Sequence, residues 1–318
     1  MDSETEIFSM ALDFPEQIEE AVNAPLPRIK RAVKVCICGM GNSALAGDVL
    51  IDYANASPSI PITVIRDIEL PGWVDSKTTV ILLSYSGDSD EVILAYDEAR
   101  ARNCKCIVIS AGGKLGKKAS ENGDRLIEIK RKGMVPREAF GIILGYLAAV
   151  LESAGVCDAA SELRRVIPEL KRTRDEIVAS GFSEVKDISG RLLHRIPVVY
   201  SLATMRAAAI RWKTQINENS KFISFCGSLP EFNHNEIVGW MDGDDRNRIF
   251  IPVIIYDNDA PQMVRCMLDA SMSILEDGKI DMAVYHVMGE SNIGKNLTCI
   301  LMGDLVSLYL AHIRHVLE

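Results

Sequence analysis

Short apolar runs rich in β-branched residues alternate with helical stretches along most of this chain, and that alternation restricts the fold more than any other feature. Strands that alternate with helices of ordinary length form a parallel sheet. Continuous apolar strands also indicate that helices cover both of its faces. We therefore predict a doubly wound α/β fold for the first half. The predicted strands there are 33–38, 61–65, 78–83, 104–110 and 125–130, and the predicted helices are 43–54, 91–102 and 136–153.

The second half repeats this pattern after a segment of a different kind. Residues 155–181 carry apolar side chains at helical spacing with charged residues opposite, which predicts helices that bridge two domains. Pro168 is expected to kink or restart them. A second sheet is predicted from apolar runs at 196–202, 249–256 and 282–287 and from helical patterns at 261–275 and 292–318. The predicted division is a domain at 1–154, a helical linker at 155–185 and a domain at 186–318.

Composition places the chain among ordinary soluble proteins. Its 318 residues suit two domains, with 48% hydrophobic and 25% charged residues and a net charge of −9. Because no basic block occurs, nucleic acid is not an expected partner, and a phosphate ligand would have to be held by local donors. The acidic N-terminus does not resemble a signal peptide, and the longest apolar run, 139–151, is too short for a membrane span.

Two Cys-x-Cys pairs lie inside predicted strands, at Cys36 and Cys38 and at Cys104 and Cys106. A spacing of two residues puts each pair on one face of its strand. Metal ligation is one interpretation, but no histidine or further cysteine completes a ligand set nearby. We predict buried, reduced cysteines, a cytoplasmic location, and neither a metal nor a cofactor.

A glycine turn follows the first predicted strand, and its residues Gly41, Asn42 and Ser43 are candidate ligand contacts. Open α/β sheets bind ligands beyond the carboxyl ends of their strands. Glycine lets the backbone approach a ligand closely, and Ser43 lies at the start of a helix. A tight strand-to-helix turn that needs glycine explains these residues equally well.

The segment 84–89 crowds three hydroxyls, those of Ser84, Ser86 and Ser89, between a predicted strand and a predicted helix. A phosphate at this point would accept hydrogen bonds from the hydroxyls and from free backbone N–H groups, helped by the helix dipole. The alternative is a serine N-cap with ordinary turn residues. Asp88 is expected to face solvent or cap the helix, because its charge would repel a phosphate.

The stretch 212–240 offers two groups that move protons near neutral pH. Glu218 ends an apolar helical pattern, where the negative end of the dipole and partial burial would make it a stronger base. His234 follows a loop broken by proline and can exchange a proton in either direction. The plain alternative is a polar loop between two elements.

The strings NENSK and LPEFNHNEIVGW within this stretch resemble the signature of the bifunctional phosphoglucose/phosphomannose isomerases, a family built from two sugar-isomerase (SIS) domains. The resemblance implies two flavodoxin-like α-β-α sandwiches and covers almost the whole chain. It also implies that segment 84–89 matches the family's SxSGNT phosphate loop, with Ser84, Ser86 and Ser89 as donors. Asp88 departs from the Asn of that loop, and Asn42 departs from the family's second glycine.

The activity implied by the resemblance is the interconversion of glucose 6-phosphate, and of mannose 6-phosphate, with fructose 6-phosphate in carbohydrate metabolism. His234 would open the sugar ring. Glu218 would move a proton between C2 and C1 through a cis-enediol, and Arg137, in a Pro-Arg pair, would stabilise the enediolate. The relatives are homodimers with sites at the interface, so His234 is a candidate to act across it.

The family pattern is incomplete at the C-terminus. Gly303-Asp304 and Tyr309-Leu310-Ala311 match a family segment, but the chain ends at Glu318 without the threonine and lysine that line the relatives' site. Arg137 then suffices, or activity is reduced, or the protein binds sugar phosphate without turnover. No motif supports Lys295 as a replacement. A non-catalytic SIS sensor is therefore the alternative function, and an aminosugar synthase is disfavoured because the chain has no room for a glutaminase domain.

Overall fold

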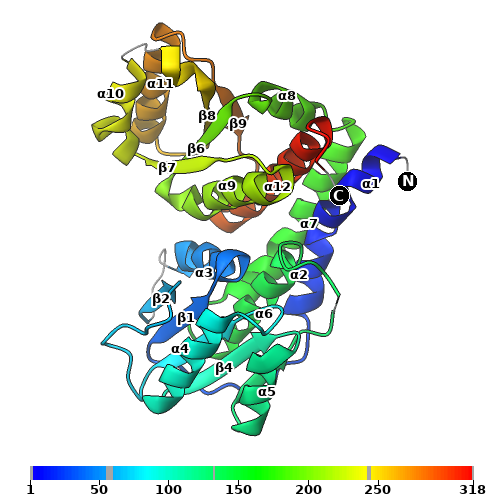
Figure 1. The fold of residues 1–318 in the computed structure, drawn as a ribbon, viewed down its shortest axis with the longest axis vertical. Coiled ribbons are helices and arrows are strands. Elements are labelled where there is room, and N and C mark those ends of the chain that lie inside the picture. The colour runs from blue at the N-terminus through cyan, green and yellow to red at the C-terminus, as the bar shows by residue number, and fades with distance from the viewer. Residues whose placement is uncertain (1–2, 55–59, 132, 242–244, 317–318) are drawn as a thin grey trace. The chain divides into compact units, whose positions relative to one another are not determined.

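The computed structural model describes residues 3–54, 60–131, 133–241 and 245–316 (Figure 1). They form two compact units. The amino-terminal unit is Asp13–Pro168, and the carboxy-terminal unit combines Met1–Leu12 with Glu169–Glu318. Each unit has its own parallel sheet, which confirms the prediction of two α/β domains.

Sheet A, in the amino-terminal unit, has five parallel strands in the order β2-β1-β3-β4-β5. The residues of β1 and β3 are buried, because valine, isoleucine, leucine and cysteine fill both faces. The strand order reverses direction between β1 and β3, and such a reversal is where doubly wound sheets bind ligands. The strands are β1 (Val35–Gly39), β2 (Ile62–Ile65), β3 (Thr79–Leu83), β4 (Lys105–Ser110) and β5 (Arg125–Glu128).

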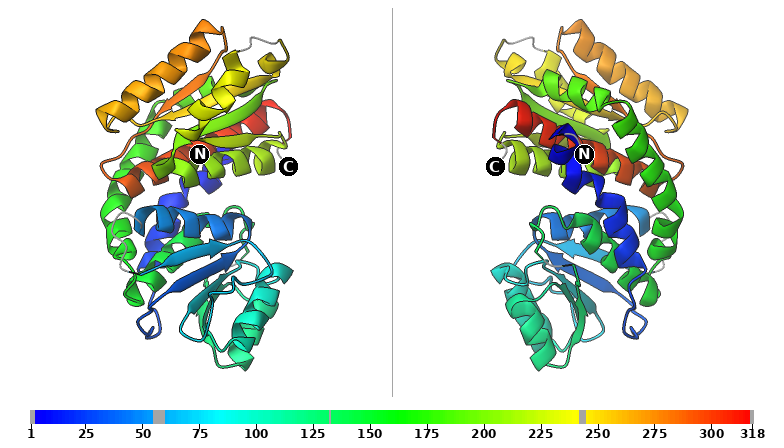
Figure 2. Two further views of the ribbon diagram at one scale, coloured as in Figure 1. Left: turned by 90° about the vertical axis from the view of Figure 1, so that its left-hand side faces the viewer. Right: turned by 90° about the vertical axis from the view of Figure 1, so that its right-hand side faces the viewer.

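Helices cover both faces of sheet A (Figure 2). Gly141 and Gly145 allow α6 to pack closely on α2, since a Cβ at either position would lie under 3.0 Å from that helix. The loop and helix between β4 and β5 were not predicted. The helices of this unit are α2 (Phe14–Val22), α3 (Gly41–Ala54), α4 (Asp90–Ala101), α5 (Gly113–Glu121) and α6 (Phe140–Ser153).

Sheet B, in the carboxy-terminal unit, has four parallel strands in the order β7-β6-β8-β9. Its edge strand β7 was not predicted. The strands are β6 (Ile196–Leu202), β7 (Phe225–Leu229), β8 (Phe250–Tyr256) and β9 (Ala283–His286). The helices around it are α8 (Ser183–Leu192), α9 (Arg206–Ser220), α10 (Glu236–Met241), α11 (Gln262–Asp277) and α12 (Asn292–Ile313), with short 3-10 turns η1 (Ala203–Met205), η2 (Glu231–His234) and η3 (Asp245–Ile249).

Helix α12 is the central helix of the carboxy-terminal unit. It is the one described helix long and apolar enough to cross a membrane, yet 83% of its apolar window is buried inside the protein. The indole N–H of Trp212 on α9 donates to the carbonyl of Cys299 at 2.7 Å. Gly303 leaves room for the Trp212 ring, which would lie 2.3 Å from a Cβ at that position. These contacts fix α9 along α12.

The boundaries of the two units differ from the predicted ones. Helix α1 (Ser3–Leu12) belongs with the carboxy-terminal unit, because the Phe8 ring stacks on Phe182 at 4.2 Å and lies 6.2 Å from Tyr309. Helix α7 (Ala159–Ala179) is continuous through Pro168, and the division between the units falls directly after that residue. The predicted linker is thus shared between the units, and residue 154 is not a boundary.

Candidate functional site

The glycine turn and the serine segment leave sheet A side by side. Gly39, the last residue of β1, pairs in register with Leu83, the last residue of β3. Segments 41–43 and 84–89 therefore start from neighbouring strands at the carboxyl edge. This is the point where the strand order reverses, so the structure brings both groups of predicted residues to one place.

Within the serine segment, two of the three hydroxyls touch. The Oγ atoms of Ser84 and Ser89 lie 3.1 Å apart, and Ser84 Oγ also accepts the N–H of Gly87 at 3.1 Å. Ser86 is exposed, and its Oγ accepts the N–H of Asp88 at 3.3 Å. Ser89 stands at the N-cap of α4 without a side-chain capping bond. Its hydroxyl faces Ser84 instead, which argues against the simple N-cap interpretation.

Gly87 gives this segment its shape. Its φ is +77°, and a Cβ there would lie 1.9 Å from the carbonyl oxygen of Gly112. The serine segment thus packs backbone to backbone against the turn that follows β4. Only glycine satisfies both the positive φ and the lack of space.

Asp88 faces solvent, as expected. Its side chain is exposed, and its carboxylate accepts the backbone N–H of Lys114 at 3.0 Å, in the first turn of α5. A carboxylate at a helix N-terminus is favoured by the free N–H groups and the dipole. The Asp88 carboxylate therefore interacts with the N-terminus of α5.

The glycine turn contributes the start of α3. Gly41 has a φ of +49°, a conformation that favours glycine. Asn42 is buried, Ser43 is half-buried, and the N–H of Ser43 donates to the carbonyl of Met40 at 3.1 Å. The helix starts two residues earlier than the predicted one, so Gly41 and Asn42 belong to its first turn.

Arg137 is carried by a loop that Tyr85 holds against the serine segment. The Tyr85 hydroxyl donates to the carbonyl of Arg131 at 3.0 Å and accepts the N–H of Met134 at 3.1 Å. Arg137 is half-buried and precedes α6, which starts at Phe140 and not at the predicted residue 136. Burial raises the pKa of the adjacent Glu138, and the charge of Arg137 partly opposes that rise. No pattern in the sequence predicted this role of Tyr85.

Glu218 lies in the last turn of α9 and is half-buried. An ion pair buried between α9 and α12 holds this helix. Arg211 donates from Nε and Nη2 to the two carboxylate oxygens of Asp304, at 2.8 and 2.7 Å. Burial raises the pKa of Asp304, and Arg211 opposes that rise. In the last turn of the helix, Asn219 donates to Ser307 Oγ at 2.9 Å.

His234 ends η2 and is exposed. Its neighbours are fixed: Asn233 Oδ1 accepts the hydroxyl of Ser271 at 2.8 Å, and Asn235 Nδ2 donates to Glu231 at 2.9 Å. The imidazole is thus presented to solvent from a well-anchored turn.

Within one chain, Glu218 lies near the amino ends of the strands of sheet B, and His234 lies near their carboxyl ends. Helix α9 runs from the carboxyl end of β6 to the amino end of β7, where Asn217 Oδ1 accepts the N–H of Ser224 at 2.8 Å. His234 follows the carboxyl end of β7. A helix of 15 residues spans about 22 Å, so one chain does not bring these two groups onto one sugar.

Lys295 is engaged in a structural ion pair. Its Nζ lies 2.7 Å from Asp257 and 2.9 Å from Asp259, beyond the carboxyl end of β8. Burial would lower the pKa of Lys295, but the hydrogen bonds to both carboxylates outweigh this and raise it. The side chain is 8% exposed. In sheet B, Lys295 lies at the carboxyl ends of the strands, the position that corresponds to that of segments 41–43 and 84–89 in sheet A.

A family profile and two similar proteins point to one family. Residues 183–316 match the profile described as "Bacterial phospho-glucose isomerase C-terminal SIS domain". A bifunctional phosphoglucose/phosphomannose isomerase of Caldicellulosiruptor bescii is 32% identical over 96% of this chain and 93% of its own length. The protein of the same description from Aquifex aeolicus is 33% identical over 97% and 92%.

A solved structure shares the fold at lower identity. It is the C-terminal domain of glucosamine-fructose-6-phosphate aminotransferase from Francisella tularensis, with a TM-score of 0.73, 14% identity and 98% coverage of both chains.

Proposed function

The chain belongs to the family of bifunctional phosphoglucose/phosphomannose isomerases, and from this premise we propose which of its residues carry the reaction. It is an aldose–ketose isomerase that interconverts glucose 6-phosphate and mannose 6-phosphate with fructose 6-phosphate. The observation that carries the residue assignment is the touching pair of hydroxyls, Ser84 and Ser89, at the edge where the strand order of sheet A reverses.

The phosphate of the hexose binds the serine segment. Ser84, Ser86 and Ser89 donate hydroxyl hydrogen bonds, and the free N–H groups at the start of α4 add to them. Gly41, Asn42 and Ser43 line the same edge from the neighbouring strand. Neutral donors suit a chain with a net charge of −9, because the protein as a whole does not attract anions.

Glu218 is the base of the isomerisation. From aldose to ketose, it takes the proton from C2 while the carbonyl oxygen on C1 gains a proton from solvent, which gives a cis-enediol. It then returns the proton to C1 while the hydroxyl on C2 releases its proton to solvent and becomes the ketone. Arg137 stabilises negative charge that develops on the enediolate oxygens. Glucose and mannose 6-phosphate give the same enediol when each loses its own C2 proton, so a single base serves both where the pocket near C2 lets either epimer present that proton to it.

His234 opens the sugar ring, and it does so from a second copy of the chain. It gives a proton to the ring oxygen as the C1–O5 bond breaks, and a proton leaves the C1 hydroxyl. The separation of Glu218 and His234 within one chain supports a homodimer, in which each copy completes the other's site.

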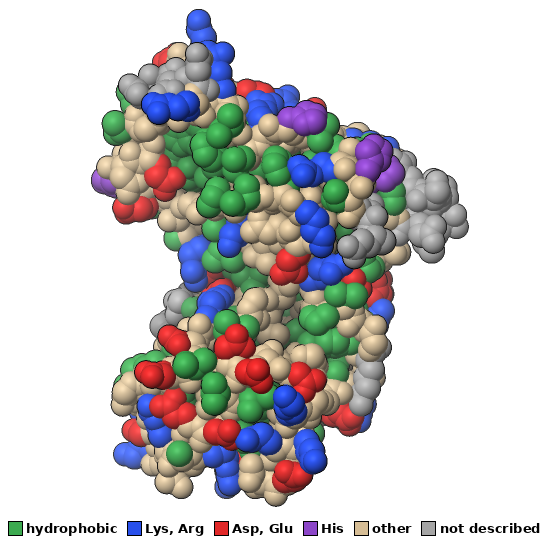
Figure 3. Space-filling model, in the orientation of Figure 1, with side chains coloured by type: hydrophobic (Ala, Val, Ile, Leu, Met, Phe, Trp, Pro, Cys, Tyr) green, Lys and Arg blue, Asp and Glu red, His purple; other side chains and the backbone are tan. Residues whose placement is uncertain are grey.

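Exposed apolar side chains around β7 and α10 support the same assembly. Ile223, Phe225, Val238 and Met241 surround the edge strand β7 and helix α10, and each is between 46% and 65% exposed. Figure 3 shows apolar side chains gathered on this unit. Apolar groups clustered beside an unpaired strand edge mark a protein interface.

The proposed location is the cytoplasm, with fructose 6-phosphate supplied to or drawn from glycolysis and gluconeogenesis. Cys36, Cys38, Cys104 and Cys106 are buried, and the Sγ atoms of the first pair lie 3.8 Å apart, too far for a disulfide. Free buried thiols suit a reducing compartment.

Replacing Glu218 by Gln tests the assignment. Turnover of fructose 6-phosphate in a coupled assay should fall by about 10²–10⁴-fold, the usual contribution of a general base. Binding of the sugar phosphate, measured by calorimetry, should persist. The control is Glu276→Gln, an exposed carboxylate of the same unit on α11.

NMR with both C2 epimers in deuterated water follows the proton directly. The Glu218→Gln protein should no longer exchange the C2 proton. Unchanged turnover and exchange would refute the role of Glu218, whereas a native protein that binds but never exchanges would point to a sensor.

A further inference from the structure

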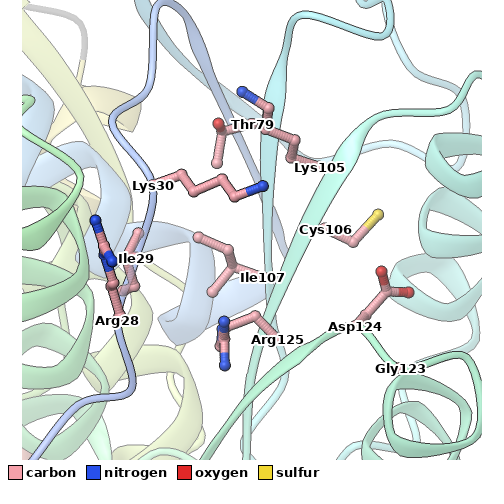
Figure 4. A pocket seen from close by; sticks show the side chains of 10 residues that line it. All are labelled: Arg28, Ile29, Lys30, Thr79, Lys105, Cys106, Ile107, Gly123, Asp124 and Arg125. Carbon is pink, nitrogen blue, oxygen red and sulfur yellow. The ribbon is translucent and has the colours of Figure 1, made fainter.

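A pocket lies at the amino ends of the strands of sheet A, at the opposite end of these strands from the serine segment. Its volume is about 270 Å³, and it opens where β3, β4 and β5 begin (Figure 4). The segment that precedes β1 forms its other wall. The residues that line it are Arg28, Ile29, Lys30, Thr79, Lys105, Cys106, Ile107, Gly123, Asp124 and Arg125.

Cationic side chains dominate this pocket. Figure 4 shows the Lys30 ammonium extended into its middle, with Lys105 and Arg125 on either side. Within the described part of the chain, none of these three, nor Arg28, forms an ion pair. The one carboxylate, that of Asp124, is already engaged by the Tyr96 hydroxyl at 2.6 Å and by Arg100 at 3.2 Å. The pocket therefore carries a local positive charge on an acidic protein.

A buried hydroxyl adds a second and independent observation. Thr79 is 2% exposed, and its Oγ1 makes no hydrogen bond within the described residues. Its side chain points toward the wall that carries Lys30 (Figure 4). Buried hydroxyls in proteins are nearly always hydrogen-bonded, and an unpaired one costs about 1–3 kcal/mol. Thr79 thus offers a donor that a ligand with acceptor oxygens would satisfy.

We propose that this pocket binds a small phosphorylated anion at a site separate from the substrate site. Lys30, Lys105 and Arg125 would pair with its charged oxygens, and Thr79 would donate to one of them. Ionised pairs of this kind are stronger than neutral hydrogen bonds. The volume lies at the lower limit for small-molecule pockets, about 300 Å³, so the ligand has no more than a small body beyond its phosphate groups.

The two anion sites are far enough apart to be filled together. Thr79 begins β3 and Ser84 directly follows its end, and a strand of five residues spans about 17 Å. A ligand in the basic pocket therefore does not compete with a hexose phosphate, but it contacts the same strand. Such a ligand would be bound together with the substrate and would not replace it.

Inorganic pyrophosphate is the probe for the test, with binding followed by calorimetry on the full chain. The native protein should bind two pyrophosphates per chain. Lys30→Ala/Arg125→Ala should weaken one site by about tenfold or more per residue removed and leave turnover of fructose 6-phosphate unchanged. The matched control is Lys77→Ala/Lys117→Ala, which removes the same charge from exposed positions outside the pocket.

A second variant distinguishes the substrate site from the basic pocket. Ser84→Ala/Ser89→Ala should lose the other site and keep the one in the basic pocket. Retention of both sites in Lys30→Ala/Arg125→Ala would overturn the inference. Retention of both in the serine variant would instead overturn the proposed phosphate site and leave this one standing.

Thr79→Val tests the role of the hydroxyl in binding separately from its effect on folding. Removing an unpaired buried hydroxyl should leave the unliganded melting temperature unchanged or higher. The rise in melting temperature on adding pyrophosphate should shrink. A full ligand-induced rise in this variant would show that Thr79 takes no part in binding.

Discussion

Two glycines in the amino-terminal unit separate the effects of backbone strain and of crowding. Gly87 and Gly123 have φ values of +77° and +69°. A Cβ at Gly87 would clash with the Gly112 carbonyl, whereas a Cβ at Gly123 would meet nothing within 4 Å. Both positions disfavour other residues by about 1–2 kcal/mol through φ alone. Only Gly87 also shapes the serine segment, 84–89.

Gly87→Ala should therefore cost more stability than Gly123→Ala and should abolish most activity. Urea unfolding measures the first effect, and the Gly123 variant should lose about 1–2 kcal/mol with its turnover intact. Equal losses in both variants would mean that the turn after β4 moves aside freely.

Burial of a thiol gives a prediction about chemical reactivity. Desolvation raises the pKa of Cys106 to about 12. At pH 8 only about one molecule in ten thousand then carries the thiolate, which is the reactive form. Iodoacetamide at this pH should modify exposed Cys266 and leave Cys106 untouched until urea unfolds the chain. Mass spectrometry of the peptides checks this, and rapid native labelling of Cys106 would contradict it.

At the scale of elements, the buried pair of Arg211 and Asp304 fixes α9 on α12 and so places Glu218. Asp304→Asn leaves a buried guanidinium without its counter-charge, which should cost about 3–5 kcal/mol of unfolding free energy. Arg211→Met/Asp304→Leu removes both charges and should cost less than the single change. Denaturant titration of both variants decides this. A double variant less stable than the single one would mean that the pair itself contributes net stability.

The sequence predicts most strands of both sheets because their valine and isoleucine runs are buried on two faces. Strand β7 was missed, since the edge strand Phe225–Leu229 contains glycine and serine and is partly exposed. Helix α5 was missed because its two glycines and three lysines hide a narrow apolar stripe, of which Leu115 and Ala119 are buried.

The neighbouring positions of two candidate segments were also predictable. Segments 41–43 and 84–89 meet because carboxyl ends of parallel strands share an edge. The support of the Arg137 loop by Tyr85 was not, since the two are far apart in the sequence. The separation of Glu218 from His234 was hidden as well, because a gap of sixteen residues does not reveal that a strand runs back across the sheet between them.

At the scale of the whole molecule, the proposed homodimer predicts rescue between two inactive variants. Glu218→Gln and His234→Ala should each lose activity alone. When they are refolded together in equal amounts, half of the dimers are mixed, and each has one site with both native groups. Activity should recover to about a quarter of the native value, because closed twofold symmetry makes the two sites equivalent.

Size-exclusion chromatography with light scattering establishes the dimer independently. Each variant refolded by itself serves as the control and should stay inactive. A dimer that shows no rescue would place Glu218 and His234 in separate functions, and a monomer with full activity would remove the shared site altogether.

The packing of Phe8 has a consequence for how the protein is made. Its ring stacks on Phe182 and lies beside Tyr309, residues near the middle and the end of the chain. Ribosomes add roughly 5–20 residues per second, so Tyr309 emerges roughly 15–60 s after Phe8. Helix α1 therefore gains its full set of neighbours only late in translation, when the end of α12 has been made.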